Sequence, residues 1–341
     1  MMRWRLELCH KDRRQLRDLF AILRSKPRLV RNLVGFNVPN KARGLRYLED
    51  TLRWLQAEEE IDASADEADN GNDAAFDGDG SCASVLQHKR DVVLHYSMKY
   101  QAPLKKMTKH ECVVDFARFC RSCQEGTGTS TGMRKGSSSG MSMAGRKKRV
   151  EWKCSGVLLV TGSKPMENDS LSVLESLAEV VATDPERRKR NLRGLEEFHF
   201  HCAFNPFLRG AEKKREFERL KRKLKTGLCK GVWLQIGTDI GQLTEGLEYL
   251  SKLKSMTPHT EELAVYGGLF LPSKLLLAQQ KFRPWNGVKL SDAYLGSVET
   301  ALDITRDILH VFQSHGVVPL FESKVYKVEQ LEDIERLLLL T

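Results

Sequence analysis

Short runs of continuous apolar residues alternate along the chain with longer segments whose apolar residues recur at helical spacing. Continuous apolar runs are typical of strands buried on both faces, and amphipathic segments between them indicate a parallel sheet covered by helices. The predicted strands are residues 33–38, 91–100, 156–162, 197–204, 231–237, 263–271 and 316–322. The predicted helices are residues 44–56, 110–123, 171–182, 211–226, 242–253, a segment from residue 273, 295–314 and 328–340.

The number of repeats predicts how the sheet closes. We count about eight strand–helix units, including a weak first one, which predicts an α/β protein with a closed (β/α)8 TIM barrel. A length of 341 residues suits one such domain. A doubly wound open sheet is the alternative, and it is disfavoured because no Gly-x-Gly-x-x-Gly follows a predicted strand.

Two segments interrupt this pattern. Residues 57–84 contain many Asp and Glu residues and no Lys or Arg, with too few apolar residues to form a core. Residues 125–149 are rich in Gly and Ser and end in a basic cluster. We expect both to be disordered insertions within the barrel.

The first 32 residues are Arg-rich and carry apolar residues at helical spacing. They lack the uninterrupted apolar region of a secretory signal, and their acidic residues disfavour a transit peptide. The sequence therefore predicts a basic helical extension over residues 1–32, followed by a single barrel domain over residues 33–341.

Charge and hydropathy limit the partners. The net charge is +10, but the chain shows no helix-turn-helix, zinc-finger or RNA-recognition pattern, so we expect no nucleic-acid partner. No apolar run approaches the ~20 residues needed to span a bilayer, so we expect no membrane partner. The sequence favours a cytoplasmic location and leaves organellar import and homo-oligomerisation open.

Eight cysteines at irregular spacing indicate free thiols in a reducing compartment. The pair Cys120-x-x-Cys123 stands without the second Cys or His pair that a structural zinc site needs. We predict no metal site.

In a parallel barrel, functional side chains lie at the carboxyl ends of the strands. Polar and small residues there are therefore the first candidates for a site. They are His95, Ser97, Gly162, Ser163, residues 203–205, Gln235, Gly267, Gly268 and Glu322.

At these positions the chain resembles the methylenetetrahydrofolate reductase family, which are flavin-dependent barrels. The best match is "EFERLKRKLKTGLCKGVWLQIGTDI", where the family has an acidic residue, Leu-Lys-x-Lys, a Gly and a strand ending in Thr-Gln. The segments "VVLHYSMKY", "GVLLVTGSKP" and "FHCAFNP" are similar to three further family strands and follow in family order. The similarity covers about residues 91–322 once the Gly/Ser insertion is removed.

The resemblance implies a role for each matching residue. Lys223 would meet the phosphates of the flavin cofactor FAD, and Glu216 would bond its ribityl or ribose hydroxyls. Gln235 would bind the pterin ring of a folate-type substrate. The remaining implied flavin contacts are His95, Gly162, Ser163 and Ala203.

Each of these residues also has a purely structural interpretation. Lys223 and Glu216, seven residues apart on one helix face, could form a solvated surface. Gln235 could end a strand, and His95 could be a core histidine with satisfied hydrogen bonds. Lys223 precedes Gly227 by four residues, so we expect it in the last helical turn, with Gly227 as a left-handed stop.

Two departures from the family pattern concern its acidic residues. Ser163 stands where the family carries an Asp beside the flavin. The family's first strand carries a Glu that acts as a general acid, and Asn37 is the counterpart within residues 33–38. An amide cannot donate the proton of general acid catalysis.

The resemblance therefore implies an NAD(P)H-dependent, flavin-linked oxidoreductase of one-carbon metabolism with a folate-type substrate. The alternative is a non-catalytic flavin- or folate-binding barrel that has lost its proton donor. A methyltransferase barrel is disfavoured because no corrinoid or zinc-ligand motif is evident.

Overall fold

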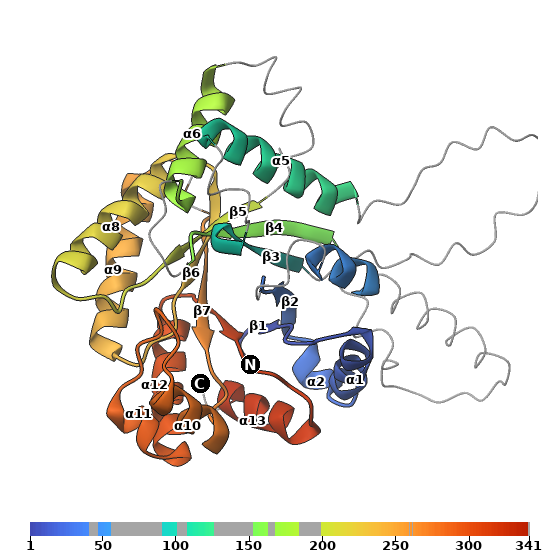
Figure 1. Ribbon diagram of the computed structural model, residues 1–341. Coiled ribbons are helices and arrows are strands. Elements are labelled where there is room, and N and C mark those ends of the chain that lie inside the picture. Colours follow the sequence, from blue (N-terminus) through green and yellow to red (C-terminus); the bar gives the residue numbers. More distant parts are fainter. Residues whose placement is uncertain are drawn as a thin grey trace, which may run out of the picture.

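Eight parallel strands form a closed barrel in the order β1 to β8, with helices around it (Figure 1). The computed structural model describes residues 1–40, 47–55, 91–100, 108–125, 153–162, 168–183, 199–258, 260 and 262–339. Each of the seven predicted strands overlaps an observed one, and the predicted (β/α)8 barrel is confirmed. Of the two predicted insertions, residues 57–84 and 126–149 lie outside the described residues.

The elements follow the expected alternation of strand and helix. The strands are β1 (Trp4–Glu7), β2 (Leu33–Val38), β3 (Asp91–Ser97), β4 (Lys153–Val160), β5 (His199–Phe204), β6 (Cys229–Leu234), β7 (Ala264–Leu269) and β8 (Val318–Phe321). The helices are α1 (Arg13–Arg24), α2 (Pro27–Val30), the 3-10 turn η1 (Met98–Tyr100), α5 (Lys109–Glu125), α6 (Ser170–Thr183), α8 (Gly210–Lys225), α9 (Ile240–Met256), α10 (Lys274–Phe282), α11 (Asp292–Gly296), α12 (Val298–Ser314) and α13 (Val328–Leu339). Residues 47–55 are also helical.

The barrel starts earlier than the sequence predicts. Strand β1 pairs with β2 on one side and with β8 on the other, so it closes the barrel. The prediction that residues 1–32 form a helical extension is therefore wrong: they contain β1, α1 and α2. The strand was missed because it is only four residues long and its inward positions carry charges, Arg5 and Glu7, instead of apolar side chains.

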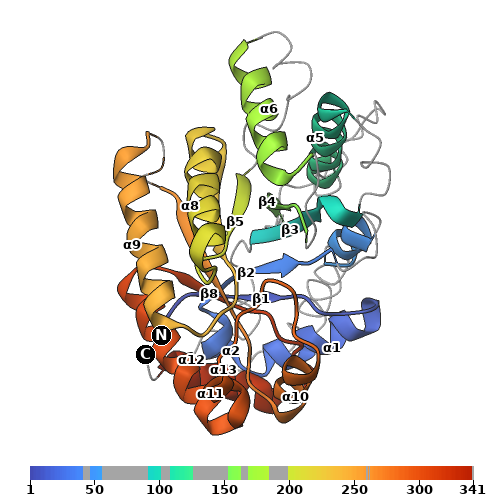
Figure 2. The same ribbon diagram turned by 60° about the vertical axis from the view of Figure 1, so that its left-hand side comes forward.

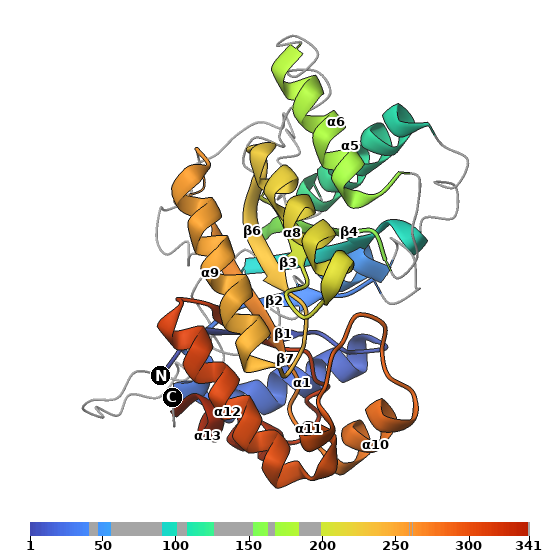
Figure 3. The same cartoon turned by 90° about the vertical axis from the view of Figure 1, so that its left-hand side faces the viewer.

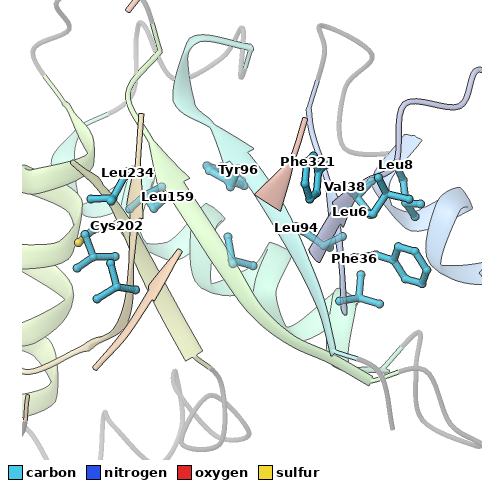
Figure 4. Close-up of a cluster of buried hydrophobic side chains, with 14 of the residues drawn as sticks. Leu6, Leu8, Phe36, Val38, Leu94, Tyr96, Leu159, Cys202, Leu234 and Phe321 are labelled. Carbon is cyan, nitrogen blue, oxygen red and sulfur yellow. The ribbon is translucent and has the colours of Figure 1, made fainter. Parts of the chain in front are cut away.

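The outward side chains of the strands form the main core against the surrounding helices. Figure 4 shows these side chains from successive strands, among them Leu6, Phe36, Leu94 and Leu159. Helices α8 and α9 lie side by side on the outside of the barrel, as Figures 2 and 3 both show. Burial of apolar area on this face is the main driving force for barrel formation.

A smaller core fills the barrel interior. It consists of inward residues from four strands, Val93, Leu158, Trp233 and Leu320. The interior is therefore packed by side chains, as in other barrels of eight strands. Ligands are expected to reach the strand ends and not the barrel axis.

Helix termini follow ordinary capping rules. Asp12 caps α1 by accepting a hydrogen bond from the Gln15 N–H, and Asp239 caps α9 in the same way through Gln242. Gly227 follows α8 with a φ of 70°, which confirms the predicted left-handed stop. Within the described residues, no helix combines the length and hydropathy that crossing a membrane requires.

Candidate functional site

Four predicted site residues lie on one side of the mouth, the opening at the carboxyl ends of the strands. His95 lies in β3, Gly162 follows β4, Ala203 lies in β5 and Gln235 follows β6. These four strands are consecutive in the barrel. Side chains of a strand alternate between its two faces, so residues an even number of positions apart share a face. His95, Gly162 and Gln235 are two, four and two positions after the interior residues Val93, Leu158 and Trp233, and Ala203 packs against the interior core, so all four are on the inward face. Ser163 lies outside the described residues.

The four residues are more accessible to solvent than the residues deeper in the barrel. His95, Ala203 and Gln235 are half-buried, and Gly162 is exposed. Deeper inward residues of the same strands, such as Leu158 and Trp233, are buried. Ala203 and Gly162 therefore contribute only small groups at the carboxyl ends of β5 and β4. The Lys99 side chain packs against Gly162, where an added Cβ would meet the Lys99 Cβ at 2.6 Å.

A carboxylate of the first strand faces the same interior. Glu7 lies two residues after the inward Arg5, ends β1, and stands opposite Asn37 of β2 in the register. Its side chain is 5% exposed, and the Cys9 thiol donates a hydrogen bond of 3.2 Å to Oε1. The assignment of Asn37 to the first strand is wrong, because β2 is the second strand and Glu7 ends the first.

Glu7 and Arg5 were both missed by the sequence analysis. Four residues that alternate between apolar and charged could belong to a strand or to the first turn of an amphipathic helix, so the pattern does not distinguish the two. The usable signal was Trp4-Arg5-Leu6-Glu7 itself, which alternates with the period of a strand.

A buried arginine organises the barrel interior below the mouth. The Arg5 side chain is 1% exposed. It donates hydrogen bonds to Asn37 Oδ1 at 3.0 Å, to Asp91 Oδ2 at 2.7 Å and to the Phe36 carbonyl at 3.0 Å. Asn37 in turn lies 3.0 Å from Nε2 of His95. Charge is tolerated here because the guanidinium is paired and its donors are largely satisfied.

Aromatic rings close the interior beneath this network. Trp233 and Tyr266 stack with centroids 4.0 Å apart, and the Arg5 guanidinium lies within 5.5 Å of both rings. Burial raises the pKa of Tyr266. His201 packs edge-on against Trp233, and burial holds its pKa well below its ordinary value. These groups are neutral at physiological pH, so Arg5 and Asp91 supply the charge at this level.

Helix α8 contacts the carboxyl end of β5 through Lys223 and Glu216, the two residues predicted to bind the flavin. Lys223 is 4% exposed, and its Nζ donates to the Ala203 carbonyl at 2.8 Å. Glu216 Oε1 accepts a hydrogen bond of 3.1 Å from the Asn205 N–H. The interpretation of these two residues as a solvated helix face is wrong, because both point inward and bind the backbone of the strand end.

An ion pair links this region to the start of α6. Arg219 of α8 bonds Asp169 at 2.7 Å, and Asp169 also accepts from the Ser172 N–H. Burial would raise the pKa of Asp169, but the Ser172 hydrogen bond and the Arg219 guanidinium outweigh it and lower that pKa. Asp169 is thus held as an anion that fixes α6 against α8.

The segment between α10 and α11 packs over the end of β6. The Lys289 N–H donates to the Ile236 carbonyl at 3.1 Å, and the Asn205 amide donates to the Gly287 carbonyl at 3.1 Å. A side chain at Gly287 would meet Nε2 of Gln235 at 2.8 Å, and φ there is 87°. Gln235 is therefore enclosed on one side by this segment, while its Oε1 accepts from the Ile236 N–H.

The cysteines lie mostly behind the barrel wall. Cys120 and Cys123 are buried free thiols of α5. In the part of the chain that the structure describes, no three or more His, Cys, Asp or Glu side chains gather as metal ligands.

Comparisons with known proteins add the following. No protein-family model matches the sequence, and no curated protein matches it. An uncharacterised protein from Clostridium thermocellum that binds two copies of 5-methyl-5,6,7,8-tetrahydrofolic acid is similar in structure, with a TM-score of 0.46, 11% identity, and coverage of 98% of this chain and 92% of that one. The homocysteine methyltransferase MmuM from Escherichia coli, in its apo form, has a TM-score of 0.29 at 11% identity, over 74% of this chain and 97% of that one. Neither similarity is close enough to assign a function.

Proposed function

We propose that the mouth of this barrel binds FAD and that the protein reduces a folate-type substrate with NAD(P)H as the hydride source. Glu7 carries this proposal. The resemblance calls for a carboxylate on the first strand, and β1 ends in one that faces the interior two residues above Arg5. A carboxyl group can give a proton to a substrate nitrogen, which the amide of Asn37 cannot.

The residues around the mouth suit a flat, hydrogen-bonding cofactor. Gly162 and Ala203 contribute small groups at the ends of β4 and β5, and His95 and Gln235 add polar groups on either side. Bound FAD would supply two-electron hydride chemistry. The chain itself would position the rings, exclude water from them and hold the proton on Glu7.

Substrate recognition would fall to the β6 end. Gln235 presents an amide, which offers both a donor and an acceptor to a pterin-type ring. The Ile236 N–H, which donates to Gln235 Oε1 at 2.9 Å, holds the amide in one orientation. A fixed amide loses less conformational entropy on binding than a mobile one.

The proposal is tested by the absorption spectrum of the purified protein after incubation with FAD and desalting. We expect retained flavin absorbance, bleaching of that absorbance by NAD(P)H under anaerobic conditions, and recovery of colour when methylene-tetrahydrofolate is added. Retained flavin without bleaching would instead support the non-catalytic binding barrel. A colourless protein that also fails to oxidise NAD(P)H would contradict the proposal.

A buried lysine provides a second test. Replacing Lys223 with methionine keeps most of the packing but removes the donor to the Ala203 carbonyl. A hydrogen bond from a charged group contributes roughly 1.5–3 kcal/mol, so we expect a loss of about that size in urea denaturation. If Nζ also meets a flavin phosphate, FAD affinity should fall about ten- to a hundred-fold.

Lys225→Met is the matched control, because Lys225 is exposed in the same turn of α8. It should change the free energy of unfolding by less than about 0.5 kcal/mol and leave FAD titrations unchanged. Equal FAD affinity in the two variants would remove Lys223 from the cofactor site and leave it a structural clamp on β5.

A further inference from the structure

His201 of β5 lies in the barrel interior, and its ring is buried without a hydrogen-bond partner. The residue is 2% exposed, and within the described residues neither Nδ1 nor Nε2 has a partner. The ring fits between two glycines. A Cβ added at Gly156 of β4 would be 2.5 Å from Nε2, and one added at Gly231 of β6 would be closer still to Nδ1. A buried polar group without a partner costs free energy, so this histidine lowers the stability of the fold.

The rings and charges around His201 favour its uncharged form. It packs edge-on against Trp233 and Tyr266, with centroids 5.8 Å and 5.9 Å away. The Arg5 guanidinium lies over the same two rings, and the Asp91 carboxylate is already paired with Arg5. A second positive charge at this level would therefore meet one cation and no uncommitted anion among the described residues.

Groups that titrate or carry charge reach this level of the barrel from several strands. They are Arg5 on β1 with Arg3 just before it, Asp91 and His95 on β3, His199 on β5 and Tyr266 on β7. The neighbours on β4 and β6, which are Gly156, Gly231 and Trp233, do not titrate.

We propose that His201 makes this barrel acid-sensitive, because the folded interior accepts only the neutral ring and acid favours the opened chain, in which His201 can take up a proton. Trp233 would transmit the opening to the mouth. It contacts His95 at 6.4 Å between centroids and lies two residues before Gln235. This acid sensitivity is a property of the ligand-free barrel, whatever the mouth binds.

The pH range follows from where each state takes up the proton. Burial, and after it the charge of Arg5, holds the pKa of His201 in the folded protein well below its ordinary value. In the unfolded chain the ring has its ordinary pKa of about 6.5. Below that pH the unfolded state binds the additional proton. The stability is therefore fully present above about pH 6.5 and declines as the pH falls from there toward the folded-state pKa.

The test is the pH dependence of urea unfolding in the ligand-free wild type and in His201→Leu, whose side chain cannot titrate. Between about pH 7.5 and about pH 5.5, the unfolding equilibrium constant should rise about tenfold more in the wild type than in His201→Leu. His310→Leu is the matched control, because His310 is exposed on α12, and it should keep the wild-type pH dependence. Equal pH dependence in the wild type and His201→Leu would overturn the proposal.

Nuclear magnetic resonance of the wild-type protein tests the same point without a substitution, in case His201→Leu fails to fold. The side chains of histidine would be labelled with ¹⁵N, and His201 assigned through its contacts with the rings of Trp233 and Tyr266. We expect the signals of a neutral imidazole in the folded protein at about pH 5.5. Imidazolium signals from His201 in the folded protein at that pH would overturn the proposal.

Discussion

Replacing Arg5 with methionine is expected to lower the free energy of unfolding by about 3 kcal/mol. This is the lower end of the range for removing one partner of a buried ion pair, because the Asp91 side chain is 30% exposed. The substitution leaves the Asn37 amide oxygen, the Phe36 carbonyl and the Asp91 carboxylate without their donors. Methionine fills a similar length, so lost packing contributes little. Urea denaturation followed by circular dichroism measures the change.

Two further variants separate the causes. Arg5→Lys keeps the charge but has no planar fork of donors, so it should recover only part of the loss. Arg215→Met, at an exposed position of α8, should change stability by less than about 0.5 kcal/mol. An Arg5→Met protein as stable as Arg215→Met would show that the network contributes nothing to the fold.

The second large effect is expected at Glu7. Glu7→Gln keeps the shape of the side chain but removes its capacity to donate a proton. If Glu7 is the general acid, folate reduction should slow by about 10²–10⁴-fold. The reduction of bound FAD by NAD(P)H should keep its wild-type rate, because that half-reaction needs no proton from Glu7.

Stopped-flow absorbance separates the two half-reactions. Glu218→Gln is the control, since this carboxylate is 61% exposed on α8 and should leave both rates unchanged. If Glu7→Gln slows both half-reactions equally, the residue supports the cofactor site as a whole. If it slows neither, the acid lies elsewhere.

The sequence predicted much of the scaffold because its signals are local. Continuous apolar runs identified seven strands, and the helical spacing between them identified the covering helices, so the number of units indicated a closed barrel. The strand-end rule also placed His95, Gly162, Ala203 and Gln235 at the mouth before any contact was known. Those residues follow buried strands directly, so chain order alone locates them.

The parts that the sequence did not reveal depend on contacts across the barrel. In the sequence, Arg5 and Glu7 look like charged residues of a basic amphipathic segment. In the structure, their strand lies between β2 and β8. Lys223 reads as a last-turn lysine until α8 packs and brings its ammonium against the Ala203 carbonyl. In both cases the energy of burying a charge is offset by partners far away in the sequence, which no local pattern can show.

The sequence by itself therefore determined the class of fold and which polar and small residues end the strands at one edge of the barrel. Only the tertiary structure decided which strand is first. The first strand ends in the carboxylate of Glu7, whereas the sequence analysis placed the amide of Asn37 there. The physical reason is that a barrel closes through pairing of its first and last strands. The hydrophobic pattern of a four-residue strand is too short to be recognised in the sequence. The segment is a strand because its neighbours in the barrel pair with its backbone and with its charged side chains.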